Sequence, residues 1–261
     1  MSGSARDAAR RGARRAAVPA LVAFAAVVTG FSGTTAAAAT ARPAADDWKW
    51  ALPPGFPVPL VPKDNRMSKA KVELGRFLFY DPKLSGNGTQ SCSSCHLQAK
   101  AFSDGRAQGL GSTGELHPRG PQSLTNVAYN TTLTWANPAL VRLERQAETP
   151  LFGEHPVEMG VTDRNKARVL ARFQRSKAYR ARYAAAYPRV KKPVTWANTV
   201  KAIAAFQRTL ISGDSRYDRL LQRKARFTAS EQRGAELFFG ERAECHHCHG
   251  GFNFTEQTTF V

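Results

Sequence analysis

All four cysteines of the chain lie in two short motifs of the same form, Cys-x-x-Cys-His. This pattern is the attachment signature of c-type haem. Two residues between the cysteines let both sulfur atoms reach the vinyl groups at one edge of a porphyrin, and the next histidine then serves as the proximal ligand of the iron. The sequence therefore predicts two covalently bound haem c groups, each iron bound by the histidine of its motif. The residues that would hold them are Cys92, Cys95 and His96 in the first motif and Cys245, Cys248 and His249 in the second.

Two other uses of paired cysteines compete with this interpretation. A redox-active dithiol also has two residues between its cysteines, but it does not require a histidine directly after the pair. A zinc ribbon uses two such pairs ~15–20 residues apart, whereas about 150 residues separate the two pairs here. The haem interpretation is favoured because it also explains the histidine in both copies.

The composition limits the class of protein. The chain has 261 residues, a hydrophobic content of 42%, and 38 basic against 20 acidic side chains, which gives a net charge of +18. Such a hydrophobic content supports a packed core and excludes a wholly disordered or collagen-like chain. No apolar run has the length of a membrane span, so an integral membrane protein is not expected. The charge favours acidic partners, although basic residues spread along the chain also fit a solvated surface.

The first 39 residues are typical of a secretory signal peptide. Five arginines between Arg6 and Arg15 precede an apolar run from Val18 to Val28, and alanines 36–39 offer an Ala-x-Ala cleavage site. The alternative is an uncleaved membrane anchor, which the short, interrupted apolar core disfavours. Because covalent haem c is made outside the cytoplasm, we expect a periplasmic protein, and nucleic acid is not an expected partner.

The rest of the chain reads as mostly helical, without convincing alternating strand patterns. A Pro-rich arm at residues 52–59 and loops over residues 86–119 interrupt the helical regions. Each expected helix has a capping or first-turn residue at its start. We expect helices after Ser68, from Pro138 to about Glu148, from Asp163 to about Ala186, from Thr195 to before Gly213, and after Thr228, which forms a capping box with Glu231.

One internal repeat links two of these helices to the two motifs. Residues 75–80 match residues 234–239 as Gly-x-x-Leu-Phe-aromatic, and each stretch precedes a Cys-x-x-Cys-His motif. A match of six residues can arise from composition. The shared position before the same motif favours duplication of a helix-then-motif unit.

Two haem groups suit either an electron carrier or an enzyme, and the sixth coordination position of the iron distinguishes them. A carrier needs a strong second ligand on each iron. An enzyme needs one open iron with acid–base groups above it. Outside the leader and the motifs, the candidate ligands are Met67, Met159, His117 and His155.

Several further stretches resemble the bacterial di-haem cytochrome c peroxidases and their MauG-type relatives, and the resemblance covers essentially all of residues 66–261. They are residues 74–81, 84–89, 101–105, 123–130, 156–160 and 208–212, together with the motif at 92–96. Residues 134–138 and 151–156 look most like the MbnH branch of this family. Members of that branch oxidise a tryptophan on a companion copper-binding protein.

The resemblance implies a division of labour between the haems. The haem at His96 would react with hydrogen peroxide, and the haem at His249 would transfer electrons. The resemblance also implies an all-α, two-lobe c-type cytochrome fold with one haem in each lobe. We therefore expect a peroxidase that uses a small exported redox protein as electron donor, or one that oxidises residues of a partner protein of the MbnP type. A non-catalytic di-haem electron carrier is the alternative.

Four residues match the family's functional positions. Gln146, Pro150 and Glu158 match the residues over the open face of the peroxide-reacting haem, and Trp135 matches the tryptophan between the haems. A carboxylate such as Glu158 can move a proton between the two oxygens of peroxide, and Gln146 can hold peroxide by hydrogen bonds. Without the resemblance, the alternative interpretation is that Glu158 is an ordinary surface carboxylate and Trp135 an aromatic residue of the core.

The chain departs from the family pattern in three places. His117 lies nearer to Arg119 than the family's sixth-ligand histidine lies to its arginine, so we expect an open iron rather than ligation by His117. The family's asparagine that helps bind calcium between the haems falls at Gly120, where only backbone carbonyls could contribute. The chain also ends shortly after His249, before the helices that carry that haem's sixth ligand in the family.

The expected organisation follows from these observations. Residues 1–39 form the signal peptide and residues 40–66 the Pro-rich arm. Residues 67–225 form the first, peroxidatic haem domain. Residues 226–261 form the start of a second, electron-transfer haem domain, which we expect to be truncated.

Overall fold

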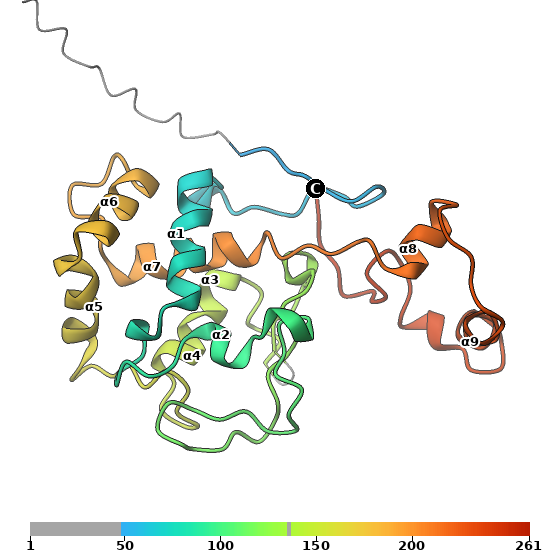
Figure 1. Cartoon of the computed structure of the whole chain (residues 1–261), viewed down its shortest axis with the longest axis horizontal. Helices are drawn as coiled ribbons and strands as arrows, with labels where there is room; N and C mark the ends of the chain where they lie inside the picture. The colour runs from blue at the N-terminus through green and yellow to red at the C-terminus, as the bar shows by residue number, and fades with distance from the viewer. Residues whose placement is uncertain (1–47, 135–136) are drawn as a thin grey trace, which may run out of the picture. The chain divides into compact units, whose positions relative to one another are not determined.

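Two packed helices, α1 (Lys69–Tyr80) and α7 (Trp196–Gln207), form the centre of the fold (Figure 1). The computed structural model describes residues 48–134 and 137–261, which fall within one unit of the chain. Both helices begin at the expected residues. The Ser68 hydroxyl accepts a hydrogen bond from the backbone of Lys71 (3.2 Å), and the Thr195 hydroxyl accepts one from Asn198 (3.2 Å). These N-caps satisfy backbone donors that the first turn of a helix leaves free.

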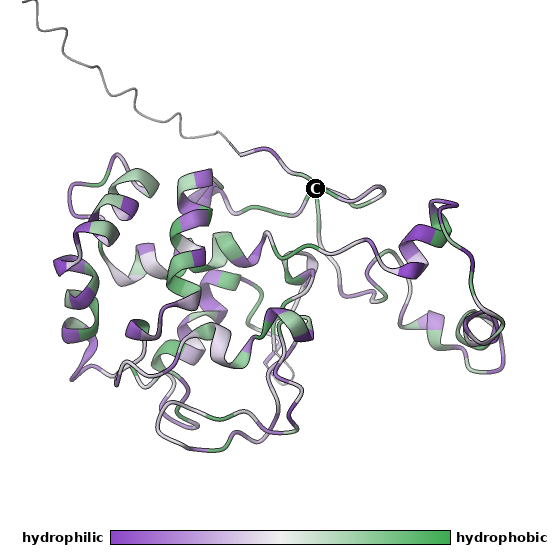
Figure 2. Cartoon of the chain, viewed as in Figure 1, coloured by the Kyte–Doolittle hydropathy of each residue, from purple (hydrophilic) through white to green (hydrophobic). Residues whose placement is uncertain are grey.

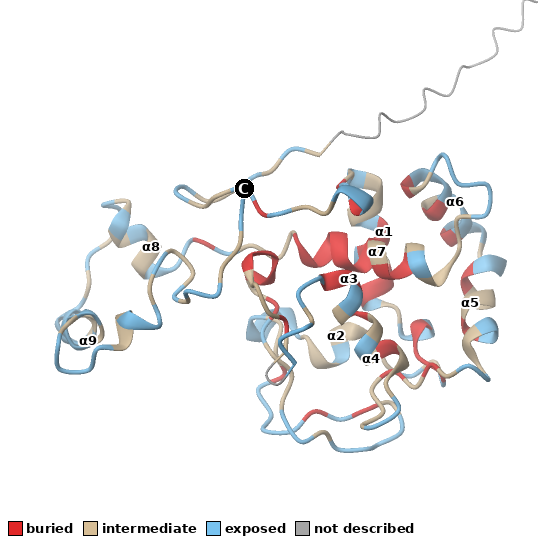
Figure 3. Cartoon of the chain, turned by 180° about the vertical axis from the view of Figure 1, so that it is seen from behind, coloured by how far each residue is buried: buried red, intermediate tan, exposed pale blue. Residues whose placement is uncertain are grey.

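Helices α1 and α7 approach closely because α1 has a glycine at the contact. A Cβ atom on Gly75 would lie 1.9 Å from the carbonyl oxygen of Ala202, so no other residue fits there without moving α7. Leu74, Leu78 and Phe79 of α1 are fully buried beside this contact. Figure 3 shows that burial is concentrated on these central helices, and Figure 2 shows that hydrophobic and hydrophilic residues alternate around α1 and α5.

The remaining elements are short helices joined by loops. The α-helices are α2 (Cys92–Cys95), α3 (Leu143–Gln146), α4 (Glu148–Phe152), α5 (Lys166–Arg175), α6 (Lys177–Ala186), α8 (Arg216–Leu221) and α9 (Ala229–Phe239). The 3-10 helices are η1 (Lys63–Asn65), η2 (Pro82–Leu84), η3 (Gln98–Lys100), η4 (Val127–Tyr129) and η5 (Cys245–His247). Between residues 48 and 261, leaving out 135–136, extended pairing is limited to isolated bridges. The prediction of an all-α fold is confirmed.

The predicted start of a helix at Pro138 is wrong, because residues 138–139 form a turn and α3 starts at Leu143, inside the predicted range. The Asn137 side chain accepts a hydrogen bond from the backbone of Ala139 (3.0 Å), and the backbone of Leu133 donates to Leu140 (2.9 Å). An asparagine that bonds two residues ahead offers the backbone an alternative to the helix. This local bond outweighs the helix-start preference of Pro138.

The predicted single helix from Asp163 to Ala186 is two helices, and its start is also wrong. Helix α5 begins at Lys166 after Asn165, whose side chain accepts from Thr162 (2.9 Å) and donates to Gly160 (2.9 Å). The chain then turns at Ser176, whose hydroxyl accepts from the first turn of α6. The turn lets the buried faces of both helices reach the core.

A buried ion pair fixes α3 against the end of α7. The guanidinium of Arg208 lies 2.8 Å and 3.0 Å from the two carboxylate oxygens of Glu144, and the Asn65 amide donates to the same carboxylate (2.6 Å). Burial raises the pKa of Glu144, but the hydrogen bonds and charge of Arg208 and the bond from Asn65 outweigh that effect and lower the pKa overall. This contact positions the short helix that carries Gln146.

The capping box predicted at Thr228 and Glu231 is confirmed at the start of α9. Helix α8, which lies before it, was not predicted. None of the helices found in residues 48–134 and 137–261 has the length and apolar character needed to cross a membrane.

Candidate functional site

The first cysteine pair lies on a single helical turn, α2. The backbone of this turn is capped at Ser91, which exchanges hydrogen bonds with Ser94 in a capping box. The amide of His96 donates to the carbonyl of Cys92 (2.9 Å). Because residues three apart share one face of a helix, the turn places the Cys92 and Cys95 side chains on the same side, with His96 directly after them.

His96 is oriented by a backbone carbonyl. Its Nδ1 lies 2.7 Å from the carbonyl oxygen of Phe102, a residue in the left-handed backbone region (φ 59°). With Nδ1–H donated to this carbonyl, Nε2 carries the lone pair and can bind a metal. Burial lowers the pKa of His96, while backbone hydrogen bonds to Phe102 and Gln122 oppose the shift. The neutral imidazole favoured by burial is the form that ligates metals.

The second motif repeats this local arrangement. Nδ1 of His249 lies 3.1 Å from the carbonyl oxygen of Phe254, which is also in the left-handed region (φ 52°). The amide of His249 donates to the carbonyl of Cys245 (3.0 Å), as in the first motif. Both motifs therefore present two cysteines and an imidazole whose Nδ1 is held by a phenylalanine carbonyl.

The geometry disfavours the two competing uses of the cysteines. Burial raises the pKa of Cys92 to about 12 and also raises the pKa of Cys95, whereas redox-active dithiols have lowered thiol pKa values. The four cysteines are free of disulfides. In the part of the chain that the structure describes, no three His, Cys, Asp or Glu side chains are grouped for a metal ion, so the two pairs do not form a zinc ribbon.

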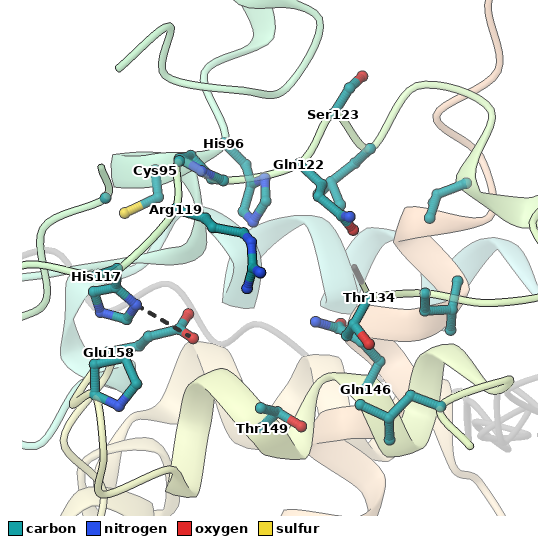
Figure 4. A pocket seen from close by; sticks show the side chains of 18 of the residues that line it. Cys95, His96, His117, Arg119, Gln122, Ser123, Thr134, Gln146, Thr149 and Glu158 are labelled. Atoms are coloured by element: carbon teal, nitrogen blue, oxygen red, sulfur yellow. Dashed lines mark ion pairs between the residues drawn. The ribbon is translucent and has the colours of Figure 1, made fainter. Parts of the chain in front are cut away.

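A cavity of about 500 Å³ lies beside the first motif (Figure 4). Its volume is within the usual range for ligand and cofactor sites. Cys95 and His96 lie on one side of it, and Gln146 and Thr149 extend into it from α3 and α4. Two thiols, an oriented neutral imidazole and an adjoining cavity of this size fit a thioether-linked haem.

A smaller cavity of about 60 Å³ brings the predicted residues together. It is lined by Cys92, Cys95, His96, Gln146, Pro150, Glu158, Met159 and Gln207, among others. The Gln207 amide oxygen is buried and has no protein hydrogen-bond partner, which is unusual for a buried polar atom and suits a site that receives a polar ligand. Gln146, Pro150 and Glu158, which are far apart in sequence from the first motif, therefore face it in space.

The other candidate residues, the tryptophan and the possible sixth ligands of the iron, lie in different parts of the structure. Trp135 lies outside the described residues. Met159 is buried and lines the small cavity, whereas Met67 is buried in the core and lines neither cavity beside the first motif. His155 is exposed.

The structure adds one contact that the sequence did not indicate. Nδ1 of His117 lies 4.0 Å from a carboxylate oxygen of Glu158, and both side chains line the larger cavity (Figure 4). Burial raises the pKa of Glu158, and the charge of His117 opposes that rise. These residues are about 40 positions apart in sequence, so no local pattern could have paired them.

Gly120 has a steric reason to be glycine. A Cβ atom there would lie 2.2 Å from the carbonyl oxygen of Arg106. An asparagine, as expected for the family's calcium site, does not fit at this position without a shift of the loop. At this position only a backbone carbonyl could contribute to a calcium site between the haems, as expected from the sequence.

Comparison with known proteins identifies the family. The family described as di-haem cytochrome c peroxidase matches residues 69–226. This chain belongs to that family. The family character implies two covalently bound c-type haems, in agreement with the two motifs.

Curated relatives include two named enzymes. The chain is 40% identical over 217 residues to the cytochrome-c peroxidase IdrP1 of Denitromonas iodatirespirans, an alignment that covers 81% of this chain and 54% of the relative. It is 33% identical over 250 residues to the methylamine utilization protein MauG of Methylorubrum extorquens, covering 92% of this chain and 68% of that protein. The chain thus spans about half to two thirds of the length of these relatives.

A solved structure agrees with this assignment. A MauG-like protein associated with microbial copper homeostasis is 55% identical, with a TM-score of 0.79, and the match covers 81% of this chain and 61% of that one. The di-haem peroxidase BthA of Burkholderia thailandensis, at 24% identity and a TM-score of 0.61, shares the fold.

Proposed function

We propose that this protein is an exported di-haem peroxidase that reacts with hydrogen peroxide at its first haem and passes electrons through its second. Cys92, Cys95 and His96 attach the first haem in this proposal, and the equivalent residues of the second motif attach the other. The observation that carries the proposal is the meeting of Gln146, Pro150 and Glu158 with the first motif around one small cavity. A plain electron carrier has no need of an acid–base group there.

Glu158 is proposed as the acid–base residue. When bound, the haem supplies the iron at which the O–O bond of peroxide is cleaved. Glu158 takes a proton from one peroxide oxygen and returns it to the other, which leaves as water. Burial raises the pKa of this carboxyl, and the charge of His117 opposes the rise. A raised pKa suits a group that must act first as base and then as acid.

Gln146 is proposed to orient the peroxide. Its amide offers both donors and an acceptor, and it does not titrate. The helix that carries it is held by the buried pair of Glu144 and Arg208, which limits its movement. Trp135 is proposed to relay electrons between the two haems, because a large aromatic system can lose an electron.

The partners and the location follow from the leader, the charge and the relatives. A periplasmic site is proposed from the signal-peptide pattern. The electron donor is proposed to be a small exported redox protein, and the positive net charge favours an acidic one: it is +18 for the full sequence and +14 without the five arginines and one aspartate of residues 1–39. The 55% identical relative is associated with copper homeostasis, which supports the variant in which an exported copper-binding protein of the MbnP type is oxidised.

The test uses the full-length, haem-loaded protein in its oxidised state. Mixing it with hydrogen peroxide is expected to change the haem absorption spectrum without prior reduction, as for a MauG-type protein. A requirement for prior reduction would instead favour a peroxidase driven by a redox donor. The Glu158→Gln variant is expected to slow the peroxide reaction about 10²–10⁴-fold, while Glu256→Gln, an exposed carboxylate near the second motif, is the matched control.

The alternative is a di-haem electron carrier, and one observation bears on it. The thioether of Met159 lies in the wall of the small cavity and is a candidate sixth ligand. If both irons are six-coordinate and inert to peroxide in the full-length protein, the protein is an electron carrier and the peroxidase proposal is wrong.

A further inference from the structure

The loop of residues 109–119 is fastened to the segment that carries Glu158. The backbone of Ser112 donates to the carbonyl of Glu158 (2.7 Å). A Cβ atom on Gly111 would lie 1.7 Å from the carbonyl oxygen of Val157, so the loop can approach this closely only with glycine at that position. The loop is therefore placed on residues 157–158 by backbone contacts that do not depend on any charge.

Two side chains of the same loop complete the contact. The carboxylate of Glu115 accepts a hydrogen bond from the backbone of Val157 (3.1 Å). Nε2 of His117 lies 3.3 Å from the carbonyl oxygen of Val157. A carbonyl can only accept, so this contact assigns the hydrogen to Nε2 and leaves Nδ1 free to gain or lose a proton.

Nδ1 of His117 faces the carboxylate of Glu158 across 4.0 Å. This separation suits an ion pair and is longer than a direct hydrogen bond. Rotation of the carboxyl group or one bridging water closes it. The His117 side chain is only 13% exposed, against 40% for Glu158, whose free surface includes the part that lines the cavity.

The other groups around the larger cavity do not compete for this proton. Arg119, from the same loop, carries a guanidinium group, which donates hydrogen bonds and does not accept them. Cys95 and His96 come from the first motif and are committed to the haem in the proposed function. Helices α3 and α4 contribute Gln146 and Thr149, which do not titrate. Among the described residues that line the cavity, His117 is thus the group beside Glu158 whose side chain can both accept and donate a proton.

We propose that His117 is a positioning residue that stores a proton for Glu158. The Glu158 carboxyl passes its proton to Nδ1 of His117 before it takes up the peroxide proton, and the stored proton returns from Nδ1 after Glu158 has delivered the peroxide proton to the leaving oxygen. No electrons move in this exchange. The inference deepens the proposed peroxidase function, because it names the group that sets the proton occupancy of the acid–base residue.

The first measurement follows the protonation of Glu158 directly and needs no turnover. Infrared spectra of the full-length haem-loaded protein are recorded against pH, and the carboxyl band that disappears in Glu158→Gln is assigned to Glu158. Loss of the opposing charge in His117→Asn is expected to move the midpoint of this band upward by about one pH unit or more. His155→Asn, which replaces the exposed histidine three residues before Glu158, is expected to leave it unchanged.

The second measurement follows the peroxide reaction. The acidic limb of its pH profile is expected to shift upward by the same amount in His117→Asn and not in His155→Asn. An unchanged carboxyl midpoint in His117→Asn would overturn the proposal. If the midpoint shifts but the unsubstituted haem-loaded protein does not react with peroxide, the pairing of His117 and Glu158 stands and the proposed function falls. The haem content of each variant is measured as a check on folding. If His117→Asn fails to fold, His117→Gln is used instead, because its longer side chain can still donate an amide hydrogen to the carbonyl of Val157.

Discussion

Helices α1 and α9 end in the same sequence pattern, at residues 75–80 and 234–239, but differ in how they are packed. Leu78 and Phe79 of α1 are fully buried, whereas their counterparts in α9 are not: Leu237 is 42% exposed and Phe238 is partly exposed. Gly75 touches the backbone of α7, but a Cβ atom on its counterpart Gly234 would meet no atom within 4 Å. Within residues 48–261, in a chain that spans about half the length of the relative IdrP1, the repeat thus extends to sequence and helix, and the packing described is that of α1.

The two motifs that follow these helices agree where the helices differ. His96 and His249 each direct Nδ1 to the carbonyl of a phenylalanine in the left-handed backbone region. This contact spans only five or six residues, so it needs no distant partner. The comparison teaches that the imidazole is oriented by local sequence, while burial requires a second element such as α7.

The largest expected difference is in the free energy of unfolding when an ion pair is broken: the buried pair of Glu144 and Arg208 beside α7, or the exposed pair of Arg216 and Glu231 at the start of α9. Arg208→Met leaves the buried carboxylate of Glu144 without its cation and is expected to lower the free energy of unfolding by about 3–5 kcal/mol. Arg216→Met breaks the exposed pair with Glu231 and is expected to cost about 0–1 kcal/mol. Denaturant titration of both variants measures the difference. Equal losses would contradict the comparison.

The next largest effect on stability is expected from replacing the two equivalent glycines of the repeat, Gly75 and Gly234. Gly75→Ala places a methyl group on the carbonyl of Ala202 and is expected to destabilise the protein by about 3 kcal/mol, because α1 must move away from α7. Gly234→Ala meets open space in a helix and is expected to stabilise it by about 0.5–1 kcal/mol. Thermal unfolding of the two variants should therefore show shifts of opposite sign.

The dependence of stability on pH is also expected to differ between the buried carboxylate of Glu144 and the more exposed carboxylate of Glu231. The folded pKa of Glu144 is lowered below its usual 4.5, so its contribution is present above pH ~4.5 and is lost as the pH falls through the folded pKa. Glu144→Gln should lower stability at neutral pH and flatten its decline in acid. The pKa of the exposed Glu231 is lowered in the same direction by hydrogen bonds from Thr228. Glu231→Gln is expected to change the acid limb much less, because solvent screens an exposed group.

The smallest effect is expected from Met159→Leu. Leucine keeps the volume and apolar character of this buried site, so stability should change by less than about 1.5 kcal/mol. If the iron at His96 is open, the absorption spectrum of the loaded protein should also stay the same. A changed spectrum would identify Met159 as a ligand and would support the electron-carrier alternative.

Local signals in the sequence predicted much of the helical structure. The caps at Ser68, Thr195 and Thr228 were predicted correctly because a capping hydrogen bond reaches only two or three residues along the chain. The start at Pro138 and the continuity across Ser176 were predicted wrongly. There, a side-chain turn at Asn137 and the need of α5 and α6 to face one core outweigh helical preference.

The candidate site shows the same limit. Its two haem motifs follow from cysteine and histidine spacing, and Gln146, Pro150 and Glu158 were named from resemblance to the family. The contact of His117 with Glu158 was not predicted, since it depends on how the loop of residues 109–119 lies on Val157. No local pattern encodes such a contact.

The sequence by itself determined the chemistry that this protein carries: two Cys-x-x-Cys-His motifs, each with an imidazole oriented by its near neighbours. Only the tertiary structure showed that Glu158 faces the first motif, placed His117 beside it, and buried α1 against α7. The reason is physical. Hydrogen bonds over a few residues follow from local sequence, whereas burial and the meeting of distant side chains depend on the packing of whole elements.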